Sequence, residues 1–316
     1  MNAHRHSYTI DASLPGPRSN AWTAFFTLMK HKVALAGLVI LLGLLFMAVF
    51  APVLAPSDPN EQDLYHVLEG PSLKHLLGTD DVGRDLLSRV IFGSRATLLM
   101  GALSTFFSAV IGVLIGLVAG YKGGIVDMVV MRITDTFMCV PALVLMLVIV
   151  SALGPGMQSI VLSITILSWT WFARIVRGQV MLVRELPYVE AANALGASGF
   201  RIMFKHLLPN VMAPIIVTAT IALGGNIMLE SAVSFLGLGV QQPTSSWGNE
   251  LRIGYSYLEV VPLFSLAPGL MITLAVLAFN FIGDGLRDAL DPRLRSSLGI
   301  RGNGYGRAGG TNAVVK

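Results

Sequence analysis

The stretch VALAGLVILLGLLFMAVFAPVL, from Val33 to Leu54, contains no charged side chain and is long enough to cross a membrane. A helix needs about 20 apolar residues to span about 30 Å of hydrocarbon. The composition of the whole chain agrees, because hydrophobic residues make up 54% of it and charged residues only 13%. A typical soluble domain carries about 25% charged residues. The sequence therefore predicts a membrane protein.

Five further apolar runs predict an all-α membrane protein, a polytopic bundle of six transmembrane helices. They extend over Ala96–Ala119, Met128–Leu153, Ile160–Val176, Val211–Leu229 and Phe264–Ile282. A β-barrel would need strands of about ten residues with alternating polarity, and these runs do not alternate. The chain shows no repeat with a period of about 20–50 residues, so we expect one membrane domain over residues 33–295.

The basic residues indicate which side of the membrane each segment faces. If the N-terminus is cytoplasmic, most of the 22 Lys and Arg residues lie inside. The exceptions are Lys74, Arg84, Arg89, Arg95 and Arg252. Because cytoplasmic loops carry such an excess, we expect both termini in the cytoplasm, with flexible segments at residues 1–32 and 296–316. The same asymmetry accounts for the net charge of +4, which is no argument for nucleic acid binding.

One polar segment, YVEAANALGASGFRIMFKHLLPN at residues 188–210, interrupts the apolar pattern. Pro187 can begin a helix, Gly196 can supply a left-handed residue at its end, and Pro209 resists continuation of a second helix. The second helix would bury one apolar face, formed by Phe200, Met203, Phe204, Leu207 and Leu208. Such a segment is either an ordinary interfacial loop or a surface for a cytoplasmic partner.

The residues of this segment favour the partner surface. They resemble the EAA loop of ABC importer permeases, in which Glu-Ala-Ala is followed by a Gly and, further on, by a Leu-Pro pair. The matching residues are Glu190, Ala191, Ala192, Gly196, Leu208 and Pro209, and His206 departs from the pattern at an aliphatic position. The resemblance implies the type I permease fold of ABC importers. It also implies that residues 185–210 form a cytoplasmic coupling loop that docks on an ATP-binding subunit.

Three longer motifs are similar to the C-type permeases of the dipeptide, oligopeptide and nickel importers. They are LGTDDVGRDLLSRVIFGSRATLLMG at Leu77–Gly101, SFLGLGVQQPTSSWG at Ser234–Gly248 and LAFNFIGDGLRDALDPR at Leu277–Arg293. The resemblance therefore extends from Leu77 to Arg293 and leaves the two ends outside it. It implies a permease subunit in the bacterial inner membrane that imports peptides, with glutathione and nickel chelates as alternative substrates.

The same resemblance implies the partners. A second, B-type permease subunit would form the translocation path with this chain, and two ATP-binding subunits would hold ATP and Mg. A periplasmic solute-binding protein would dock on the outer loop at residues 55–95 and on the Gln241–Trp247 segment. We expect neither a cofactor nor enzymatic activity in this chain, because the sequence has no GxxxxGK[ST] phosphate loop, no HExxH motif and no CxxC pair.

Two polar residues near the end of the fifth run, Asn226 and Glu230, are candidates for the translocation path. An ionisable residue in a membrane helix is usually functional or paired, and Asn226 stands one helical turn before Glu230. The alternative is that the Glu230 side chain reaches the outer interface.

Other conspicuous residues have structural interpretations. Asp80, Asp81, Arg84 and Asp85 predict a helix cap and local ion pairs, and Asp284, Arg287 and Asp288 predict local pairing on one helix. Gly112, Gly116 and Gly120 predict close packing between two helices.

A secondary transporter and a channel are the competing functional classes. Secondary transporters often show internal repeats, broken helices and charges at the membrane midplane, and only Glu230 hints at these. A channel needs a filter segment, and we find none in the sequence. Uptake that depends on ATP rather than on the proton gradient would distinguish the ABC importer.

Overall fold

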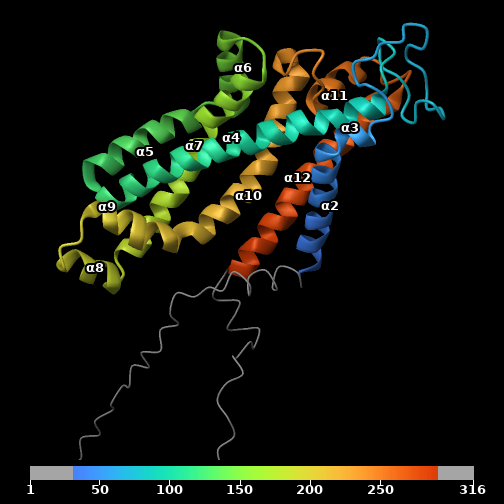
Figure 1. Cartoon of the computed structure of the whole chain (residues 1–316). Helices are drawn as coiled ribbons and strands as arrows, with labels where there is room; N and C mark the ends of the chain where they lie inside the picture. Colours follow the sequence, from blue (N-terminus) through green and yellow to red (C-terminus); the bar gives the residue numbers. More distant parts are fainter. Residues whose placement is uncertain (1–30, 291–316) are drawn as a thin grey trace, which may run out of the picture.

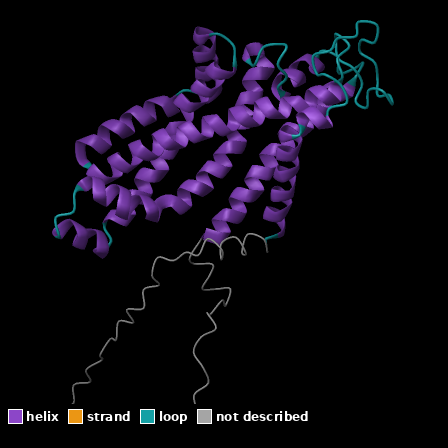
Figure 2. Ribbon diagram, viewed as in Figure 1, coloured by secondary structure: helices purple, strands orange, loops and turns teal. Residues whose placement is uncertain are grey.

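The computed structural model describes residues 31–290, and this part of the chain is almost entirely helical (Figure 2). It contains no β-strand, and one isolated bridge joins Thr79 to Asp85. The all-α prediction is confirmed. The predicted flexible segments at residues 1–32 and 296–316 lie outside the described residues, apart from His31 and Lys32.

Five stretches of helix are long and apolar enough to cross a membrane. Four of them are single helices: α2 (Lys32–Val49), α4 (Leu86–Lys122), α7 (Met157–Arg184) and α12 (Pro262–Leu290). The fifth is the continuous stretch Gly199–Leu238. It is composed of α9 (Gly199–Arg201), the π-helix η1 (Ile202–Leu207), α10 (Leu208–Val233) and the π-helix η2 (Ser234–Leu238).

The remaining predicted run, Met128–Leu153, is not one straight helix. It forms α5 (Gly124–Cys139) and α6 (Ala142–Leu153), which meet at an angle of 89°, so the described chain has six spans only if this pair counts as one. The break lies at Val140, whose backbone is extended (φ −90°, ψ 132°). The following residue, Pro141, disfavours the helical conformation at Val140, and it has no N–H to continue a helix.

The loop predicted at residues 55–95 is shorter, because α4 begins at Leu86 rather than at Ala96. The Asp85 side chain caps this helix by accepting hydrogen bonds from the Ser88 N–H and the Ser88 hydroxyl, at 2.8 and 2.7 Å. The loop therefore occupies residues 55–85. At 37 residues, α4 is about 55 Å long and exceeds the hydrocarbon thickness of a bilayer.

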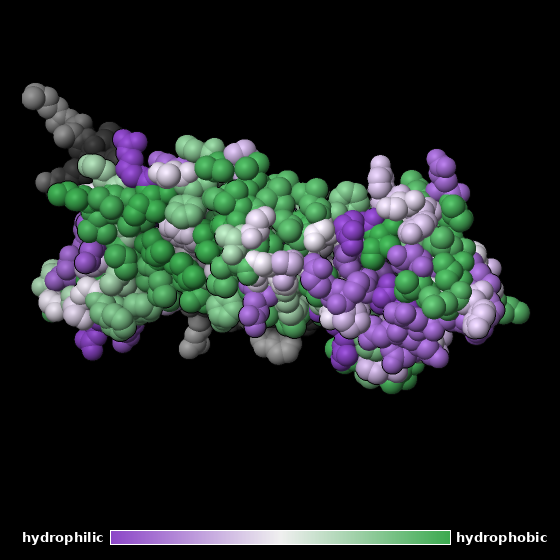
Figure 3. All heavy atoms as spheres, turned by 90° about the horizontal axis from the view of Figure 1, so that it is seen from above, coloured by the Kyte–Doolittle hydropathy of each residue, from purple (hydrophilic) through white to green (hydrophobic). Residues whose placement is uncertain are grey.

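Helix α4 runs between the two ends of the molecule (Figure 1). At one end, called the α8 end below, lies α8 (Pro187–Ala194); at the other, called the α11 end, lie α11 (Trp247–Tyr255), α3 (Ala51–Leu54) and the loop at residues 55–85. Helix α12 packs against α2, α10 and α11. Hydrophilic side chains gather at the α11 end, whereas apolar side chains cover much of the visible bundle (Figure 3).

The predicted close packing at Gly112, Gly116 and Gly120 is confirmed, since these residues pack α4 directly against the backbone of α7. A Cβ atom on Gly112 would lie 2.4 Å from the Trp169 carbonyl oxygen. On Gly116 it would lie 2.5 Å from the Ala173 oxygen, and on Gly120 2.9 Å from the Arg177 oxygen. Only glycine permits two membrane helices to approach this closely.

Candidate functional site

The first helix of the polar segment, α8, ends as predicted at Gly196. Gly196 has a φ of +77°, and the Ala197 N–H donates to the Ala192 carbonyl at 3.1 Å, while the Gly196 N–H donates to the Asn193 carbonyl at 2.9 Å. This pair of hydrogen bonds is the Schellman motif, which satisfies carbonyls that a helix end leaves free. The left-handed turn sends the chain from α8 toward α9.

The second helix does not end at Pro209, and this prediction is wrong. The helix passes from α9 through η1 into α10, and Pro209 lies in the first turn of α10. The hydrogen bonds of η1 connect residues five apart instead of four. The Leu208 N–H, for example, donates to the Met203 carbonyl. A π-helical turn relieves the clash that a proline causes in a regular α-helix, so the helix continues.

The π-helical turn also changes which side chains of this helix are buried. The predicted face of Phe200, Met203, Phe204, Leu207 and Leu208 is not buried as a unit. Ile202 and Leu207 are fully buried, whereas Phe200 and Phe204 are exposed. The extra residue in the turn breaks the regular spacing on which the prediction depended.

Around α8, several large side chains remain exposed. We call them, together with the motif carboxylate, the α8 surface: Tyr188, Glu190, Leu195, Phe200 and Phe204. Leu195 is 89% and Phe200 69% exposed, and the rings of Phe200 and Phe204 lie 4.5 Å apart. Exposed apolar patches of this kind are typical of protein–protein interfaces.

The residues of the EAA pattern occupy two parts of this region. Glu190, Ala191 and Ala192 lie on α8 and Gly196 follows it, whereas Leu208 and Pro209 lie in the first turn of α10. Glu190, Ala191, Gly196 and Pro209 are exposed, and Ala192 and Leu208 are half-buried. The two parts approach each other where the Tyr188 and His206 rings lie 6.4 Å apart.

A cavity of about 900 Å³ lies between α7, α10 and α12. Its walls are mostly apolar, and the polar side chains among them are Ser168, Gln179, Thr218, Asn226 and Arg287. Asn226 is held in place, because its Nδ2 donates to Thr105 Oγ1 at 2.8 Å and its Oδ1 accepts from the Ser168 hydroxyl at 3.0 Å. This network joins α4, α7 and α10.

Glu230 is not among the residues that line this cavity. Its side chain is fully buried, and its carboxylate accepts hydrogen bonds from the hydroxyls of Ser234, at 2.7 Å, and Ser231, at 3.2 Å. The alternative that Glu230 reaches the outer interface is therefore wrong. Glu230 and Asn226 both lie on α10 and face different surroundings.

The predicted pairing among Asp284, Arg287 and Asp288 is wrong for the described part of the chain, where no ion pair joins Arg287 to either acid. Asp288 instead lies 3.6 Å from His31 at the start of α2, and Arg287 lines the cavity. The contact of Asp288 with His31 joins the end of α12 to the beginning of α2.

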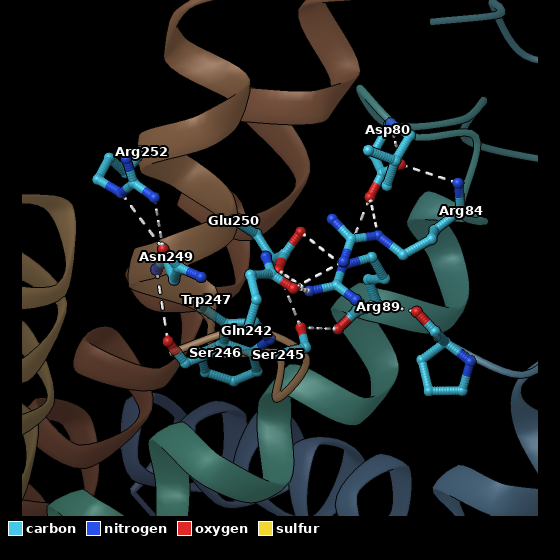
Figure 4. Close-up of polar contacts among 12 residues, drawn as sticks. Asp80, Arg84, Arg89, Gln242, Ser245, Ser246, Trp247, Asn249, Glu250 and Arg252 are labelled. Carbon is cyan, nitrogen blue, oxygen red and sulfur yellow. Dashed lines mark hydrogen bonds and ion pairs between the residues drawn. The ribbon is translucent and has the colours of Figure 1, made fainter. Parts of the chain in front are cut away.

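Sequence reasoning missed a buried ion pair at the α11 end, between Arg89 of α4 and Glu250 of α11 (Figure 4). Arg89 is 0% and Glu250 1% exposed, and Arg89 donates from Nε at 3.0 Å and from Nη2 at 2.7 Å. Arg89 also donates to the Pro59 carbonyl and to Gln242 Oε1, both at 2.9 Å. From the sequence, Arg89 was predicted to lie in the outer loop. The one hint of a buried partner was that this arginine stands close to an apolar run.

The acidic cluster before α4 forms the expected ion pairs around this site. Arg84 pairs with Asp80 and donates to Gln242 Oε1 at 2.7 Å. Burial, together with the neighbouring Asp80 carboxylate, raises the pKa of Asp81. No group of three or more His, Cys, Asp or Glu side chains that could hold a metal ion occurs within residues 31–290.

The segment Gln241–Trp247 is only partly accessible. Gln241, Gln242, Pro243 and Thr244 are exposed, whereas Ser245 and Ser246 are buried and Trp247 is fully buried. Trp247 donates from Nε1 to the Val90 carbonyl at 2.9 Å, so it packs the segment onto α4. Only the first part of the segment is therefore open to a partner.

Two family models match this sequence. Residues 112–296 match the model described as binding-protein-dependent transport system inner membrane component. Residues 19–71 match that of the N-terminal TM domain of oligopeptide transport permease C. The second match corrects the expectation that both ends lie outside the resemblance, because it begins well before Leu77.

Curated relatives are similar over most of their length. The dipeptide transport system permease protein DppC of Alkalihalophilus pseudofirmus is 42% identical over 86% of this chain and 90% of its own length. The di/tripeptide permease DppC of Pseudomonas aeruginosa is 43% identical over 94% of this chain and 100% of its own length. The glutathione permease GsiD of Pectobacterium atrosepticum is 40% identical over 90% of this chain and 94% of its own length.

A solved structure supports the fold. The chain is similar to a chain of the inward-facing MetNI methionine ABC transporter, with a TM-score of 0.54 and 23% identity, over 65% of this chain and 98% of that chain. At this identity the likeness shows the fold alone.

Proposed function

Because the chain belongs to the family of binding-protein-dependent transport system inner membrane components, we propose that it is a permease subunit of an ATP-driven peptide importer. It forms the translocation path with a second, B-type permease subunit in the inner membrane. Two separate ATP-binding subunits bind ATP and Mg, and a solute-binding protein delivers the substrate. This chain supplies part of the path and the connection to the ATP-binding subunits, and it catalyses no reaction.

The observation that carries this proposal is the α8 surface. It presents exposed apolar side chains beside Glu190 at one end of an apolar bundle, and Glu190 itself lies on α8, whose end is fixed by the Gly196 turn. Leaving Leu195 and Phe200 in water is unfavourable, so a partner that covers them gains free energy. An ATP-binding subunit in the cytoplasm is that partner, which requires both termini and α8 on the cytoplasmic side.

We place the translocation path along the cavity between α7, α10 and α12. Its volume of about 900 Å³ suits a small ligand, and Asn226 presents a fixed polar group at a mostly apolar wall. The second permease subunit closes the open side. Glu230, one turn beyond Asn226, belongs to the same path and is enclosed by Ser231 and Ser234 in this conformation, so the assignment requires that transport exposes it.

The α11 end faces the periplasm in this arrangement. The solute-binding protein docks on the loop at residues 55–85 and on the exposed residues Gln241–Thr244, where the surface is hydrophilic (Figure 3). The apolar surface of the spans contacts lipid. No surface of the chain is proposed to bind nucleic acid.

Two of the relatives named above carry dipeptides or di- and tripeptides, and on this basis we propose short peptides as the substrate. Glutathione is the second candidate, because the permease GsiD is nearly as similar. Nickel chelates remain the third alternative from the sequence motifs.

Competition for uptake tests this proposal. A strain that lacks the chain is complemented with it, and uptake of a labelled dipeptide is measured against excess glutathione, tetrapeptide or nickel chelate. We expect saturable dipeptide uptake that other short peptides suppress. Stronger suppression by glutathione would assign that substrate instead, and saturable uptake of none of these compounds would overturn the peptide assignment.

A further inference from the structure

An exposed ion pair joins α5 to α7 in the interior of both helices. Arg174 of α7 donates from Nη2 to Asp135 Oδ1 of α5 at 2.5 Å, and the two side chains are 45% and 50% exposed. Arg174 lies about 15 Å along α7 from its end at Arg184. Asp135 lies about 16 Å along α5 from its start at Gly124. Both charges are therefore inside the apolar spans rather than at their ends.

Lipid is an unfavourable neighbour for this face of α5 and α7. Charged side chains within a membrane span face the interior of a bundle or a water-filled cavity. Irregular backbone at membrane depth obeys the same rule, and residues 138–142, around the break between α5 and α6, are exposed as well. In the importer proposed above, this face therefore borders either the water of the path or the second permease subunit.

The position of the ion pair favours the water of the path. Trp171, which lies one turn before Arg174 on α7, lines the cavity between α7, α10 and α12 and is 54% exposed. Residues three apart on a helix are neighbours on its surface, so Arg174 lies beside the rim of this cavity. Asp135 extends the polar edge of the rim onto α5.

The pair uses only part of its hydrogen-bonding capacity. Within residues 31–290, Asp135 Oδ2 and the Nε and Nη1 atoms of Arg174 make no hydrogen bond. A second ion pair between the same helices differs, because Arg177 donates from Nε and Nη2 to both carboxylate oxygens of Asp127, at 2.5 and 2.6 Å. An exposed pair contributes little stability, so a ligand with complementary charges can replace the contact between Asp135 and Arg174.

A peptide with free termini is such a ligand, because it carries an ammonium and a carboxylate at neutral pH. The Asp135 carboxylate accepts hydrogen bonds from an ammonium, and the free carbonyls at the end of α5 favour the same positive charge. The Arg174 guanidinium can bind a carboxylate through two parallel hydrogen bonds. The termini of a dipeptide lie at most about 7 Å apart, so two neighbouring side chains suffice for both.

We propose that Asp135 and Arg174 form a binding site for the charged termini of a dipeptide, in which Asp135 binds the ammonium and Arg174 the carboxylate. This inference rests on the proposed function and deepens it, because it names the groups of the substrate that the path recognises. Every dipeptide with free termini carries these groups, so recognition at this site is independent of the peptide's side chains.

The single cysteine of the chain, Cys139, reports on this site, since it is exposed and lies one turn after Asp135 on α5. The chain is reconstituted in lipid nanodiscs with its second permease subunit and ATP-binding subunits. The readout is the rate at which a membrane-impermeant maleimide modifies Cys139, with and without millimolar Ala-Ala. N-acetyl-Ala-Ala-amide, which carries neither terminal charge, is the matched probe.

The variants Arg174→Gln and Asp135→Asn each remove one charge from the site. Arg177→Gln is the matched control, because it breaks the better-bonded ion pair between the same two helices. We expect Ala-Ala to slow the labelling severalfold in the parent and in Arg177→Gln, and the blocked peptide to leave it unchanged. Arg174→Gln and Asp135→Asn should lose this protection.

Several results would overturn the proposal: no labelling of Cys139 in the parent, no protection by Ala-Ala, equal protection by the blocked peptide, or full protection in Arg174→Gln. Equal loss of protection in Arg177→Gln would also overturn it, because it would show that the ion pairs act only by holding α5 against α7. Co-purification of the partner subunits checks that each variant assembles.

ATP-driven uptake of labelled Ala-Ala, measured with the solute-binding protein added, separates this outcome from failure of the proposed function. We expect Arg174→Gln to import the dipeptide severalfold more slowly than Arg177→Gln when the solute-binding protein is saturated with peptide. If the parent imports no peptide, the proposed function fails. If the parent imports Ala-Ala and the protection of Cys139 does not depend on Arg174, only this site fails.

Discussion

Gly196 determines the direction in which the chain leaves α8. Its φ of +77° is unfavourable for a residue with a branched side chain, although a Cβ atom there would meet no atom within 4 Å. The cost of Gly196→Val is therefore conformational, about 1–2 kcal/mol. We expect this variant to misplace α8 and to weaken co-purification of the ATP-binding subunits severalfold.

Gly196→Asn is the control, because asparagine tolerates the left-handed conformation. It should retain association and uptake. A companion variant, Glu190→Lys, should weaken docking by reversing a charge on the α8 surface. Normal association and uptake in both Gly196→Val and Glu190→Lys would show that this loop does not connect the permease to the ATP-binding subunits.

Glu230 either lines the translocation path or has a purely structural role, and a single substitution distinguishes the two. Glu230→Gln keeps an acceptor for the Ser234 hydroxyl and removes the charge, so we expect normal assembly and impaired uptake. The control is Glu259→Gln, an exposed acid near the α11 end. Normal uptake by Glu230→Gln would remove this residue from the path.

We expect Asp63 to make the stability of the loop at residues 55–85 depend on pH. A hydrogen bond from His66, at 2.7 Å, and nearby positive charge lower the pKa of Asp63 below its usual value of 3.8. The folded loop therefore gains stability above that value and loses it as the pH falls through the lowered pKa. Amide hydrogen exchange of the loop, corrected for intrinsic rates, should rise below about pH 4.

Asp63→Asn should abolish this dependence, because the amide does not titrate. Asp58→Asn changes an exposed acid of the same loop and serves as the control. An unchanged pH profile in Asp63→Asn would show that another group governs the loop.

At the scale of elements, the buried pair of Arg89 and Glu250 fixes α4 to α11. Removing one partner of a buried ion pair leaves the other charge uncompensated and costs about 3–5 kcal/mol. We therefore expect Glu250→Ala to lower the thermal unfolding temperature of the detergent-solubilised chain clearly. Arg95→Ala, which removes an exposed side chain near Phe92, should change it little. Equal effects of the two variants would contradict this account.

Helix type followed from the sequence wherever one apolar run formed one helix, although α4 begins at Leu86 rather than at the predicted Ala96. The prediction failed at two prolines, for opposite reasons. At Pro141 the helix breaks within a continuous apolar run, because the residue before proline becomes extended. At Pro209 the expected end does not occur, because the π-helical turn η1 accommodates the ring. Hydropathy reveals neither a break within an apolar run nor a π-helical turn that accommodates a proline.

At the scale of the whole molecule, the EAA residues and the Gly196 turn could be predicted from local sequence, because they depend on neighbouring residues. The pairing of Arg89 with Glu250 could not be, since the two residues are 161 positions apart and no local pattern relates them. The cavity beside Asn226 likewise depends on three helices that are distant in sequence. Glu230 was identified as unusual, but its enclosure by two serines required the structure.

The α8 surface and the hydrophilic α11 end lie at opposite ends of the molecule and are joined by membrane helices (Figure 1). This arrangement suits a subunit that receives energy on one side and substrate on the other. We propose that partner ATPases, acting through the α8 surface, power transport.

The most direct test is peptide uptake under separate control of the two energy sources. Uptake of a labelled dipeptide is measured after ATP depletion with the proton gradient preserved, and after collapse of the gradient with ATP preserved. The account predicts that uptake stops in the first condition and continues in the second. Uptake that persists without ATP and stops when the gradient collapses would contradict it and indicate a secondary transporter.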